Sequence, residues 1–320
     1  MTKPNITFKQ IKVLPYNPNY PQMFEAEADL IKQALGKHYI NIEHIGSTSV
    51  PKLIAKQDLD IVCVVDELLN SLLLQEIGYV YKGELNIPLR YYFSKNTEHS
   101  KVNLHVVEPN HWFITLNLCF RNYLRLNDDV RIAYANLKEN LLKDPKSYQK
   151  TNNGFTGYNF GKNQFIKSIL QQAGYNELHV NFCMHPEEWL EYHRIKEEQI
   201  FNPIKVVYDR MHISITDSNH KHFVLYKGIK IVAIAHMELF NKTEVALRAL
   251  ATDELYKNNG YGTYLINFLE KWVTYQNLYV IKMHARLSAE HFYRKLGYNN
   301  MAFDDRSISE SYINLGKKLT

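Results

Sequence analysis

The stretch Lys257-Asn258-Asn259-Gly260-Tyr261-Gly262-Thr263 stands between a strand-like segment, residues 244–250, and an amphipathic helix predicted from residue 264 onward. The helix is indicated by apolar residues at helical spacing, namely Tyr264, Leu265, Phe268, Leu269, Trp272 and Val273. A strand, a glycine turn and a helix start together predict an anion site, because unpaired backbone N–H groups and the helix dipole both favour negative charge. Gly260 and Gly262 let the backbone approach a diphosphate closely.

A second strand and a short helix follow this stretch. Residues 280–284 are predicted to form the strand, and Ser288 is predicted to cap the helix, which ends at Gly297. One face of this helix carries Ala289, Phe292, Tyr293 and Leu296.

This order of elements resembles the GNAT acyltransferases over roughly residues 177–316. In that family an Arg/Gln-x-x-Gly-x-Gly/Ala loop holds the acetyl-CoA diphosphate, and an Ala…Phe-Tyr…Gly-Phe/Tyr segment follows. Residues 184–201 look like the family's first helix, and residues 222–225 and 229–240 look like its central strands. One difference is Lys257, where the family usually has Arg or Gln. Since lysine keeps the charge but lacks the planar guanidinium, we expect weaker binding of the cofactor.

The resemblance implies acetyl-CoA as the cofactor and a small-molecule amine as the acceptor. It implies a cofactor site made of Leu250, Ala251, Thr252, Lys257, Asn258, Asn259, Gly260, Tyr261, Gly262 and Thr263. Backbone N–H groups near Ala251 and Thr252 would stabilise the oxyanion of the tetrahedral intermediate.

Three residues are candidates for the proton transfers. Tyr293 matches the family tyrosine that often protonates the departing thiolate, although a core aromatic residue would fit the same helix face. Glu244 and Glu254 are the carboxylates nearest to the cofactor strand, and each also fits a solvated surface position. A chain of water molecules is a further alternative for the base.

The loops expected around the acceptor are residues 208–219 and 300–312. Side chains that could line the acceptor pocket are His212, His220, Tyr226, Arg248 and Arg286.

The length and composition indicate two globular domains. At 320 residues the chain exceeds one typical domain, and the helical pattern that stops at Gly174 suggests domains at 1–174 and 175–320. The net charge of +5 suits phosphate-bearing ligands, but no run of lysine and arginine indicates nucleic-acid binding. Neither a signal peptide nor an apolar run of membrane-spanning length is evident, so we expect a cytoplasmic enzyme without a membrane partner.

The first half carries a different motif. Residues 42–51, Ile-Glu-His-Ile-Gly-Ser-Thr-Ser-Val-Pro, precede a buried strand that begins near Asp58. Asp58 and Asp60 are two residues apart, so both side chains project from the same face of the strand. Two carboxylates on one face are costly without a cation between them, which suggests a site for Mg²⁺. The Gly46-Ser47 turn can hold a phosphate through its N–H groups.

Residues 11–173 resemble the GrpB family, whose fold is nucleotidyltransferase-like. The matching residues are 13–16, Tyr20, Phe24, 43–51, 55–56, 60–61, 78–79, 90–93, 104–107, 120–125, Lys162 and 165–166. The resemblance implies a nucleotide or phosphate site made of Gly46, Ser47, Thr48, Lys56, Arg90, His105 and Arg121. Where a working nucleotidyltransferase has a third carboxylate, this chain has Asn103 and His105, and histidine is a poor ligand for Mg²⁺.

Structural roles would explain several of these residues equally well. Asp60 could form an ion pair with Lys56 or Arg90, His44 and His105 could be hydrogen-bonded core residues, and Arg121 could cap a helix. We therefore expect an α/β (α+β) protein: a nucleotidyltransferase-like mixed sheet with helices, then a GNAT sheet that is mixed, mostly antiparallel and flanked by helices. The expected function is N-acetylation next to a nucleotide-binding domain. The alternative is a bifunctional enzyme whose first half is a Mg-dependent nucleotidyltransferase.

Overall fold

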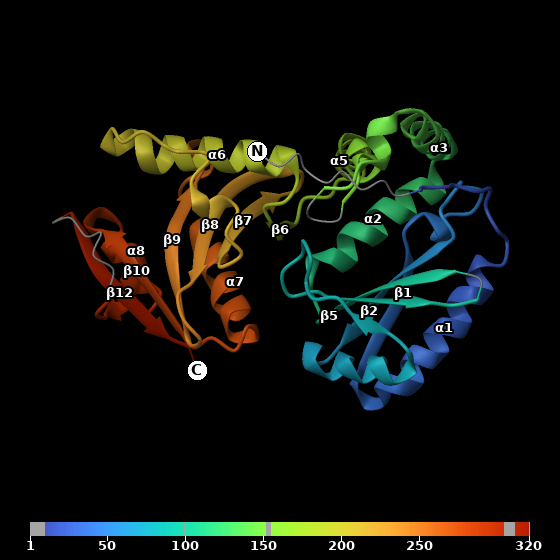
Figure 1. Cartoon of the computed structure of the whole chain (residues 1–320), viewed down its shortest axis with the longest axis horizontal. Coiled ribbons are helices and arrows are strands. Elements are labelled where there is room, and N and C mark those ends of the chain that lie inside the picture. The colour runs from blue at the N-terminus through green and yellow to red at the C-terminus, as the bar shows by residue number, and fades with distance from the viewer. Residues whose placement is uncertain (1–9, 99, 152–154, 304–310, 320) are drawn as a thin grey trace. The chain divides into compact units, whose positions relative to one another are not determined.

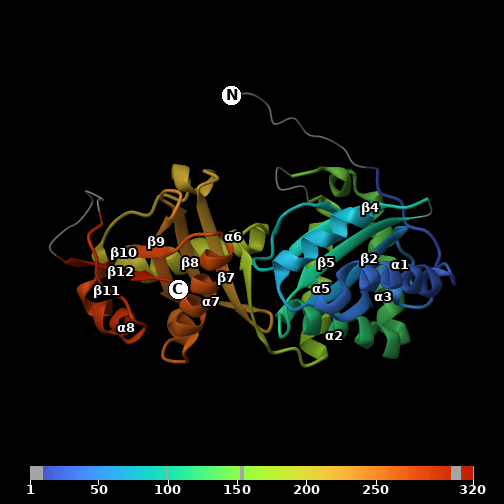
Figure 2. The ribbon, with the colours of Figure 1, turned by 90° about the horizontal axis from the view of Figure 1, so that it is seen from below.

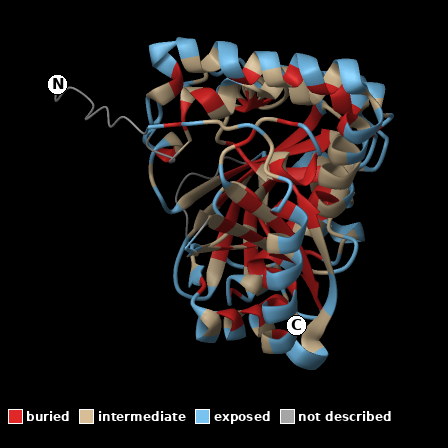
Figure 3. Cartoon of the chain, turned by 90° about the vertical axis from the view of Figure 1, so that its right-hand side faces the viewer, coloured by how far each residue is buried: buried red, intermediate tan, exposed pale blue. Residues whose placement is uncertain are grey.

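The computed structural model describes residues 10–98, 100–151, 155–303 and 311–319. The chain divides into two compact units, one of residues 1–85 and 89–177, the other of residues 86–88 and 178–320. Both units are mixed α/β, as predicted, and Figure 1 shows the first in blue to green and the second in yellow to red. Buried residues lie along the strands and the inner helix faces, whereas exposed residues cover the outer helix faces (Figure 3).

The N-terminal unit is built on a sheet of order β1-β2-β5-β4-β3. Its strands are β1 (Tyr39–Ile45), β2 (Asp58–Val65), β3 (Val80–Tyr81), β4 (Tyr91–Asn96) and β5 (Lys101–Val107). β2 and β5 pair in parallel and the other neighbours pair antiparallel, so the sheet is mixed. β2 is buried throughout from Ile61 to Val65, which explains its run of β-branched residues in the middle of the sheet.

Helices surround this sheet. They are α1 (Tyr20–Leu35), α2 (Trp112–Leu126), α3 (Asp128–Lys143), α4 (Gly157–Gly161) and α5 (Asn163–Gln172), together with the 3₁₀ segment η3 (Leu68–Ile77). α1 contacts β1 and β2, and α2 contacts β1, α3 and α5. The Gly46-Ser47 turn leads into a single 3₁₀ turn, η2 (Ser47–Ser49).

The C-terminal unit is built on a sheet of order β11-β12-β10-β9-β8-β7-β6. The strands are β6 (Leu178–Phe182), β7 (His220–Lys227), β8 (Lys230–Leu239), β9 (Glu244–Thr252), β10 (Val280–Arg286), β11 (Asn299–Asn300) and β12 (Tyr312–Lys318). β9 and β10 pair in parallel and all other neighbours pair antiparallel. The predicted mixed, mostly antiparallel sheet is thus confirmed.

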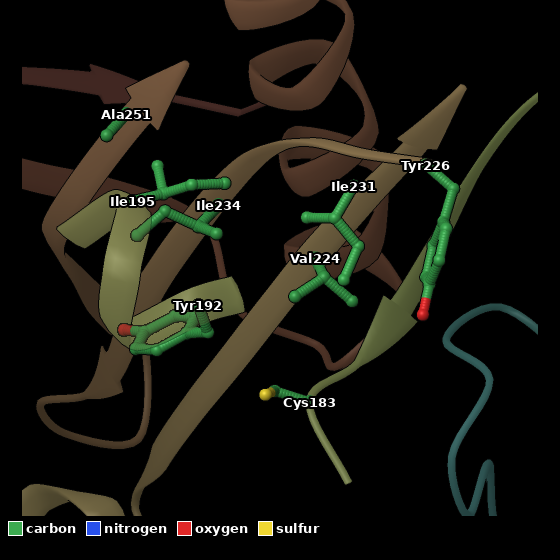
Figure 4. Packing of buried hydrophobic residues seen from close by; sticks show 8 residues of the cluster. All are labelled: Cys183, Tyr192, Ile195, Val224, Tyr226, Ile231, Ile234 and Ala251. Carbon is green, nitrogen blue, oxygen red and sulfur yellow. The ribbon is translucent and has the colours of Figure 1, made fainter. Parts of the chain in front are cut away.

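Two long helices cover opposite faces of the middle strands. Tyr192 and Ile195 of α6 (Pro186–Lys196) pack with Val224 of β7 and Ala251 of β9, as Figure 4 shows. The next residue back, Phe223, points to the other face and contacts Trp272 of α7 (Tyr261–Tyr275).

Several boundaries differ from the predicted ones. α7 begins at Tyr261, three residues earlier than predicted, because Gly260 adopts the left-handed conformation that ends the preceding turn (φ 79°). Ser288 lies in a 3₁₀ turn, η9 (Leu287–Ala289), and Ala289 takes the capping position of α8 (Glu290–Lys295). The predicted first helix stops being α-helical at Lys196 and continues as a π-helical turn, η5 (Glu197–Phe201).

Candidate functional sites

The sheet of the C-terminal unit opens between β9 and β10. Their parallel pairing covers three residue pairs, from Glu244 with Val280 to Ala246 with Lys282, and then ends. β9 continues to Thr252, paired with β8 alone, and β10 continues to Arg286, paired with β12. Beyond Ala246, each of the two strands therefore presents backbone N–H and C=O groups that have no partner strand on the inner side.

The start of α7 lies at the open end of β9. A Cβ atom added to Gly262 would lie 3.4 Å from Phe292 Cζ and 3.8 Å from Thr252 Oγ1, which shows how closely the helix start and the strand end approach. A Cβ atom added to Gly260 would have nothing within 4 Å. The first N–H groups of an α-helix have no partner within the helix, so this turn presents donors to an open surface. The predicted cofactor residues 250–252 and 257–263 are adjacent here.

Side chains of the glycine turn are exposed. Lys257 Nζ lies 2.5 Å from Glu254 Oε2, and both side chains are largely open to solvent. The predicted base Glu254 is therefore a surface carboxylate paired with the lysine of the turn. Asn259 Nδ2 donates to the carbonyl oxygens of Tyr256 and Lys257 and holds the turn in shape.

The other two predicted catalytic residues lie in different surroundings. Glu244 is at the start of β9, at the opposite end from Thr252, and its Oε1 lies 2.8 Å from Lys282 Nζ. That contact with Lys282 lowers the pKa of Glu244. Tyr293 is buried in α8 with its ring edge-on to Tyr298, and burial raises the pKa of its hydroxyl.

A cavity of about 730 Å³ lies on the α6 side of β8 and β9. His212, His220 and Arg248, three of the residues expected around the acceptor, line it. The segment 208–219 contributes Tyr208, Asp209, Ser214 and Ile215 as well. Tyr226 and Arg286 do not line it: Tyr226 donates to Glu188, and Arg286 donates to the carbonyl of Ile200. Of the second expected loop, residues 304–310 lie outside the described residues.

Sequence reasoning missed two buried residues of this cavity, Lys196 and His236. Lys196 Nζ lies 3.5 Å from His236 Nδ1, and His236 Nε2 lies 2.8 Å from His220 Nδ1. The pairing of β8 with β9 places His236 opposite Ala249, next to an irregularity in the register that leaves Arg248 as the extra residue. Arg248 Nε donates to Glu238 Oε2 at the edge of the same cavity.

The N-terminal glycine turn is closed by side chains. Gly46 has a φ of 70°, and a Cβ atom there would collide with the carboxylate of Asp60. Asp60 Oδ1 accepts a hydrogen bond from Asn103 Nδ2 at 2.9 Å, and Asn103 Oδ1 accepts one from Tyr92 at 2.6 Å. Burial raises the pKa of Asp60 to about 6, and the neighbouring Asp58 adds to the shift.

Lysines gather next to this turn. Lys138 of α3 is 2% exposed, and its Nζ donates to Ser47 Oγ at 2.7 Å and to the carbonyl of Ile54 at 2.8 Å. Lys56 Nζ and Lys162 Nζ lie 4.9 Å and 4.7 Å from the ring centre of Tyr158. Burial is the main cause that lowers the pKa of Lys138 to about 6 and that of Lys162 to about 8. Repulsion from neighbouring lysines lowers both pKa values further. We call Lys56, Lys138 and Lys162 the lysine cluster.

The remaining predicted phosphate residues are bonded to other protein groups. Arg90 is 2% exposed, and its Nη1 donates to His105 Nδ1 at 2.5 Å. Thr48 is buried, and its hydroxyl donates to the carbonyl of Asp58. Arg121 lines a separate cavity of about 270 Å³, where its Nη1 donates to Glu43 and to the carbonyl of His44. The structure thus brings Ser47, Lys56 and Asp60 together and places Arg121 in another pocket.

The prediction of a magnesium site gains no support. The residues that the structure describes contain no group of three or more His, Cys, Asp or Glu side chains placed to hold a metal ion. Asp60 is instead hydrogen-bonded to the amide of Asn103, the residue that stands where a third carboxylate was sought. None of the helices in the described ranges combines the length and apolar character needed to cross a membrane.

Comparisons with known proteins agree with this architecture. Residues 10–172 match the model of the GrpB protein family, and residues 218–300 match that of the acetyltransferase (GNAT) domain. The UPF0157 protein YqkA of Bacillus subtilis is 31% identical over 170 residues, which make up 52% of this chain and 48% of that relative, so the match spans about half of its length. The chain belongs to the GrpB family, and its second half contains a GNAT acetyltransferase domain.

Two solved structures are similar to separate halves of the chain. The conserved protein GrpB from Enterococcus faecalis is 36% identical, and the match covers 51% of this chain and 96% of that one with a TM-score of 0.44. An acetyltransferase of the GNAT family from Staphylococcus aureus Mu50 is 14% identical, and the match covers 45% of this chain and 100% of that one with a TM-score of 0.39.

Proposed function

We propose that this GrpB-family chain transfers the acetyl group of acetyl-CoA to the nitrogen of a small amine in its C-terminal unit. The proposal depends mainly on one observation: β9 loses β10 as a neighbour after Ala246, and its free end meets the glycine turn that starts α7. A diphosphate would bind the N–H groups of residues 260–263, and the rest of the cofactor would extend along residues 250–252. The acceptor would enter the cavity of about 730 Å³ on the α6 side of β9.

The reaction follows from this placement. The acceptor nitrogen attacks the thioester carbon, the N–C bond forms, and the C–S bond breaks. Backbone N–H groups near Ala251 and Thr252 would stabilise the negative oxygen of the intermediate. Tyr293 would protonate the departing sulfur, although the raised pKa of its buried hydroxyl makes it a weaker acid than a free tyrosine. The N–H proton that the nitrogen loses as the amide forms replaces the proton given up by Tyr293, so one N–H bond breaks for each S–H bond formed.

Binding of acetyl-CoA tests the proposal without knowledge of the acceptor. At a concentration one hundred times its Kd, acetyl-CoA is expected to stabilise the protein by about 2.7 kcal/mol. Gly262→Glu, which places a carboxylate at the diphosphate site, should abolish this stabilisation. Asn267→Glu adds the same charge at an exposed position of α7 and should preserve it.

Turnover is then measured as CoA thiol release with a panel of primary amines: an alkylamine, a diamine, an amino acid ester and a peptide. Stabilisation lost in Gly262→Glu, together with release for at least one amine, is the expected result. Equal stabilisation of both variants would mean that the cofactor binds elsewhere.

A second function is favoured for the N-terminal unit by the lysine cluster. Lys138 and Lys162 are held among buried groups with lowered pKa values, so binding an anion there would relieve their mutual repulsion. We propose that Ser47, Lys56 and the other two lysines bind a phosphate-bearing ligand such as a nucleotide. Asp58 and Asp60 remain the predicted metal ligands only for the bifunctional alternative.

Pyrophosphate and ATP, each tested for thermal stabilisation, probe this second function. Lys162→Met should remove the stabilisation, whereas Lys143→Met, which loses the same charge at the exposed end of α3, should retain it. Magnesium-dependent release of pyrophosphate from nucleoside triphosphates, lost in Asp60→Ala, would support the nucleotidyltransferase alternative. Binding without such release would identify a binding module.

A further inference from the structure

The cavity proposed for the acceptor contains a buried lysine, Lys196. Lys196 is 7% exposed, and among the described residues no carboxylate lies within ion-pair distance of its Nζ. The rings of Tyr192 and Tyr208 lie 5.4 Å and 5.6 Å from Nζ. Burial lowers the pKa of Lys196 to about 8, so an appreciable fraction of this amine is neutral near neutral pH.

The backbone around Lys196 directs its side chain into the cavity. α6 ends at Lys196 and continues as the π-helical turn η5, and Ile200 and Phe201 of this turn also line the cavity. Arg286, at the end of β10, donates to the carbonyl of Ile200 and so ties the turn to the strand. Single π-helical turns within helices are frequent at functional sites.

Two imidazoles connect Lys196 to the outside. His236 is buried, and it bridges Lys196 and His220, with contacts of 3.5 Å and 2.8 Å. His220 is only half-buried, and it lines the same cavity as Lys196 and His236. His222 is stacked on His236 but does not join the path, because its Nε2 donates to the carbonyl of Ser214 and its Nδ1 accepts from Tyr192.

We propose that Lys196 is the base that deprotonates the acceptor and that His236 and His220 pass the proton on to solvent. The proposal depends on the acetyltransferase function proposed above. An N–H bond of the acceptor ammonium breaks and an N–H bond forms on Lys196. Lys196 then gives a proton to His236 Nδ1, His236 gives its Nε2 proton to His220 Nδ1, and His220 gives its Nε2 proton to water. One proton leaves the acceptor and one reaches solvent.

The proton path from Lys196 through His236 to His220 does not require either imidazole to become positively charged. Burial and then the positive charge of Lys196 lower the pKa of His236, so imidazolium is disfavoured there, but each ring gains and loses a proton together. Other charged or titratable groups also face the path. They are His193 on α6, Tyr208, Asp209 and His212 after η5, His222 on β7, Glu238 on β8 and Arg248 on β9.

The pKa of Lys196 can be measured without an acceptor. Whole protein is treated with a trace of acetic anhydride at a series of pH values, and modification of the Lys196 peptide is read by mass spectrometry. We expect half-maximal reactivity near pH 8, about two pH units below an ordinary lysine. Exposed Lys230 in the same spectra is the internal reference. Equal pH profiles for the two lysines would overturn the proposal.

Substitution of Lys196 shows whether this residue acts as a base or only supplies a positive charge. With the amine that gives the highest CoA release, Lys196→Arg and Lys196→Met should each lower kcat/KM at pH 7.5 by about a hundredfold or more. Arginine keeps the charge but cannot lose its proton, so an active Lys196→Arg variant would show that the residue binds an anionic group instead. Lys230→Arg is the matched control and should be unaffected.

Relay by the histidines has its own signature. His220→Phe should lower kcat about tenfold, and added imidazole buffer should restore part of the rate, because a small base can replace the missing ring. A loss that imidazole does not restore would mean that His220 has a purely structural role. Stabilisation by acetyl-CoA is measured in every variant, so failure of the proposed acetyltransferase, seen as absent stabilisation in the wild type, is distinguishable from failure of the relay.

Discussion

The two units use a glycine turn in opposite ways. Gly46 and Gly260 both adopt positive φ angles, 70° and 79°. Gly46 directly follows β1, and Gly260 directly precedes α7. In the N-terminal unit the turn packs against the carboxylate of Asp60, and the positive charge next to it comes from buried lysine side chains. In the C-terminal unit the turn faces open space, and its positive potential comes from the backbone at the start of α7. The site proposed for the N-terminal unit would therefore depend on side chains that titrate, and the site proposed for the C-terminal unit on amides that do not.

The largest effect that we expect is on stability, when Gly46 or Gly260 is replaced by alanine. Gly46→Ala should cost about 3 kcal/mol or more of stability, since a positive φ costs about 1–2 kcal/mol and the new Cβ also displaces Asp60. Gly260→Ala should cost about 1 kcal/mol, because its Cβ meets no neighbour. Calorimetric unfolding of the whole chain measures both. Equal losses of stability in the two variants would contradict the difference between a packed turn at Gly46 and an open turn at Gly260.

The pH dependence of binding sharpens the same contrast. Pyrophosphate affinity should fall about tenfold between pH 6.5 and 9, because Lys162, with a pKa of about 8, loses its proton in that range. Acetyl-CoA affinity should change about twofold or less, since the amides of residues 260–263 keep their protons. Titration calorimetry at both pH values measures the two constants. A pyrophosphate affinity that does not change would exclude the lysine cluster as its site.

Stability without ligand should also depend on pH through Lys138. Its pKa is about 6 in the folded protein and near 10.4 in the unfolded chain, so between these values the unfolded chain binds more protons and stability rises with pH. We expect a gain of about 2 kcal/mol between pH 7 and 8.5 in the wild type and a smaller gain in Lys138→Met. The same calorimetry with Lys143→Met, an exposed lysine of α3, is the control and should keep the full gain.

The smallest effect is expected at the exposed turn. Lys257→Arg should strengthen acetyl-CoA binding about two- to threefold, because a guanidinium can bind a phosphate with two parallel hydrogen bonds. The gain is limited because the new side chain still has Glu254 as a neighbour. Weaker binding in this variant would show that Lys257 does not contact the diphosphate.

Much of the fold could be predicted because local patterns and tertiary structure agree. The β-branched run of β2 is buried from Ile61 to Val65, as its sequence indicated. Most of the predicted apolar stripe of α7 is buried as well, whereas Tyr264 and Phe268 are half-buried. The opening between β9 and β10 depends on where a non-local pairing stops, and no local pattern reports that.

Three lysines whose pKa values are lowered by burial share a pattern in the sequence that indicates their burial. Lys138, Lys162 and Lys196 each stand four residues after a tyrosine, and each ammonium lies 4.5–5.4 Å from the ring of that tyrosine. Residues four apart are neighbours on a helix. The ring of a buried tyrosine can therefore shield the ammonium group of a lysine four residues later from solvent. A lysine at that spacing within an apolar stripe is therefore a candidate for a lowered pKa.

The short pairing between β9 and β10 also has a consequence for handling the protein. Past Ala246 the sheet has two free edges in its interior, and a foreign strand could pair with either of them. Preparations without cofactor should therefore aggregate more readily on heating or storage. Adding CoA during purification is expected to protect them, even if the acceptor is never identified.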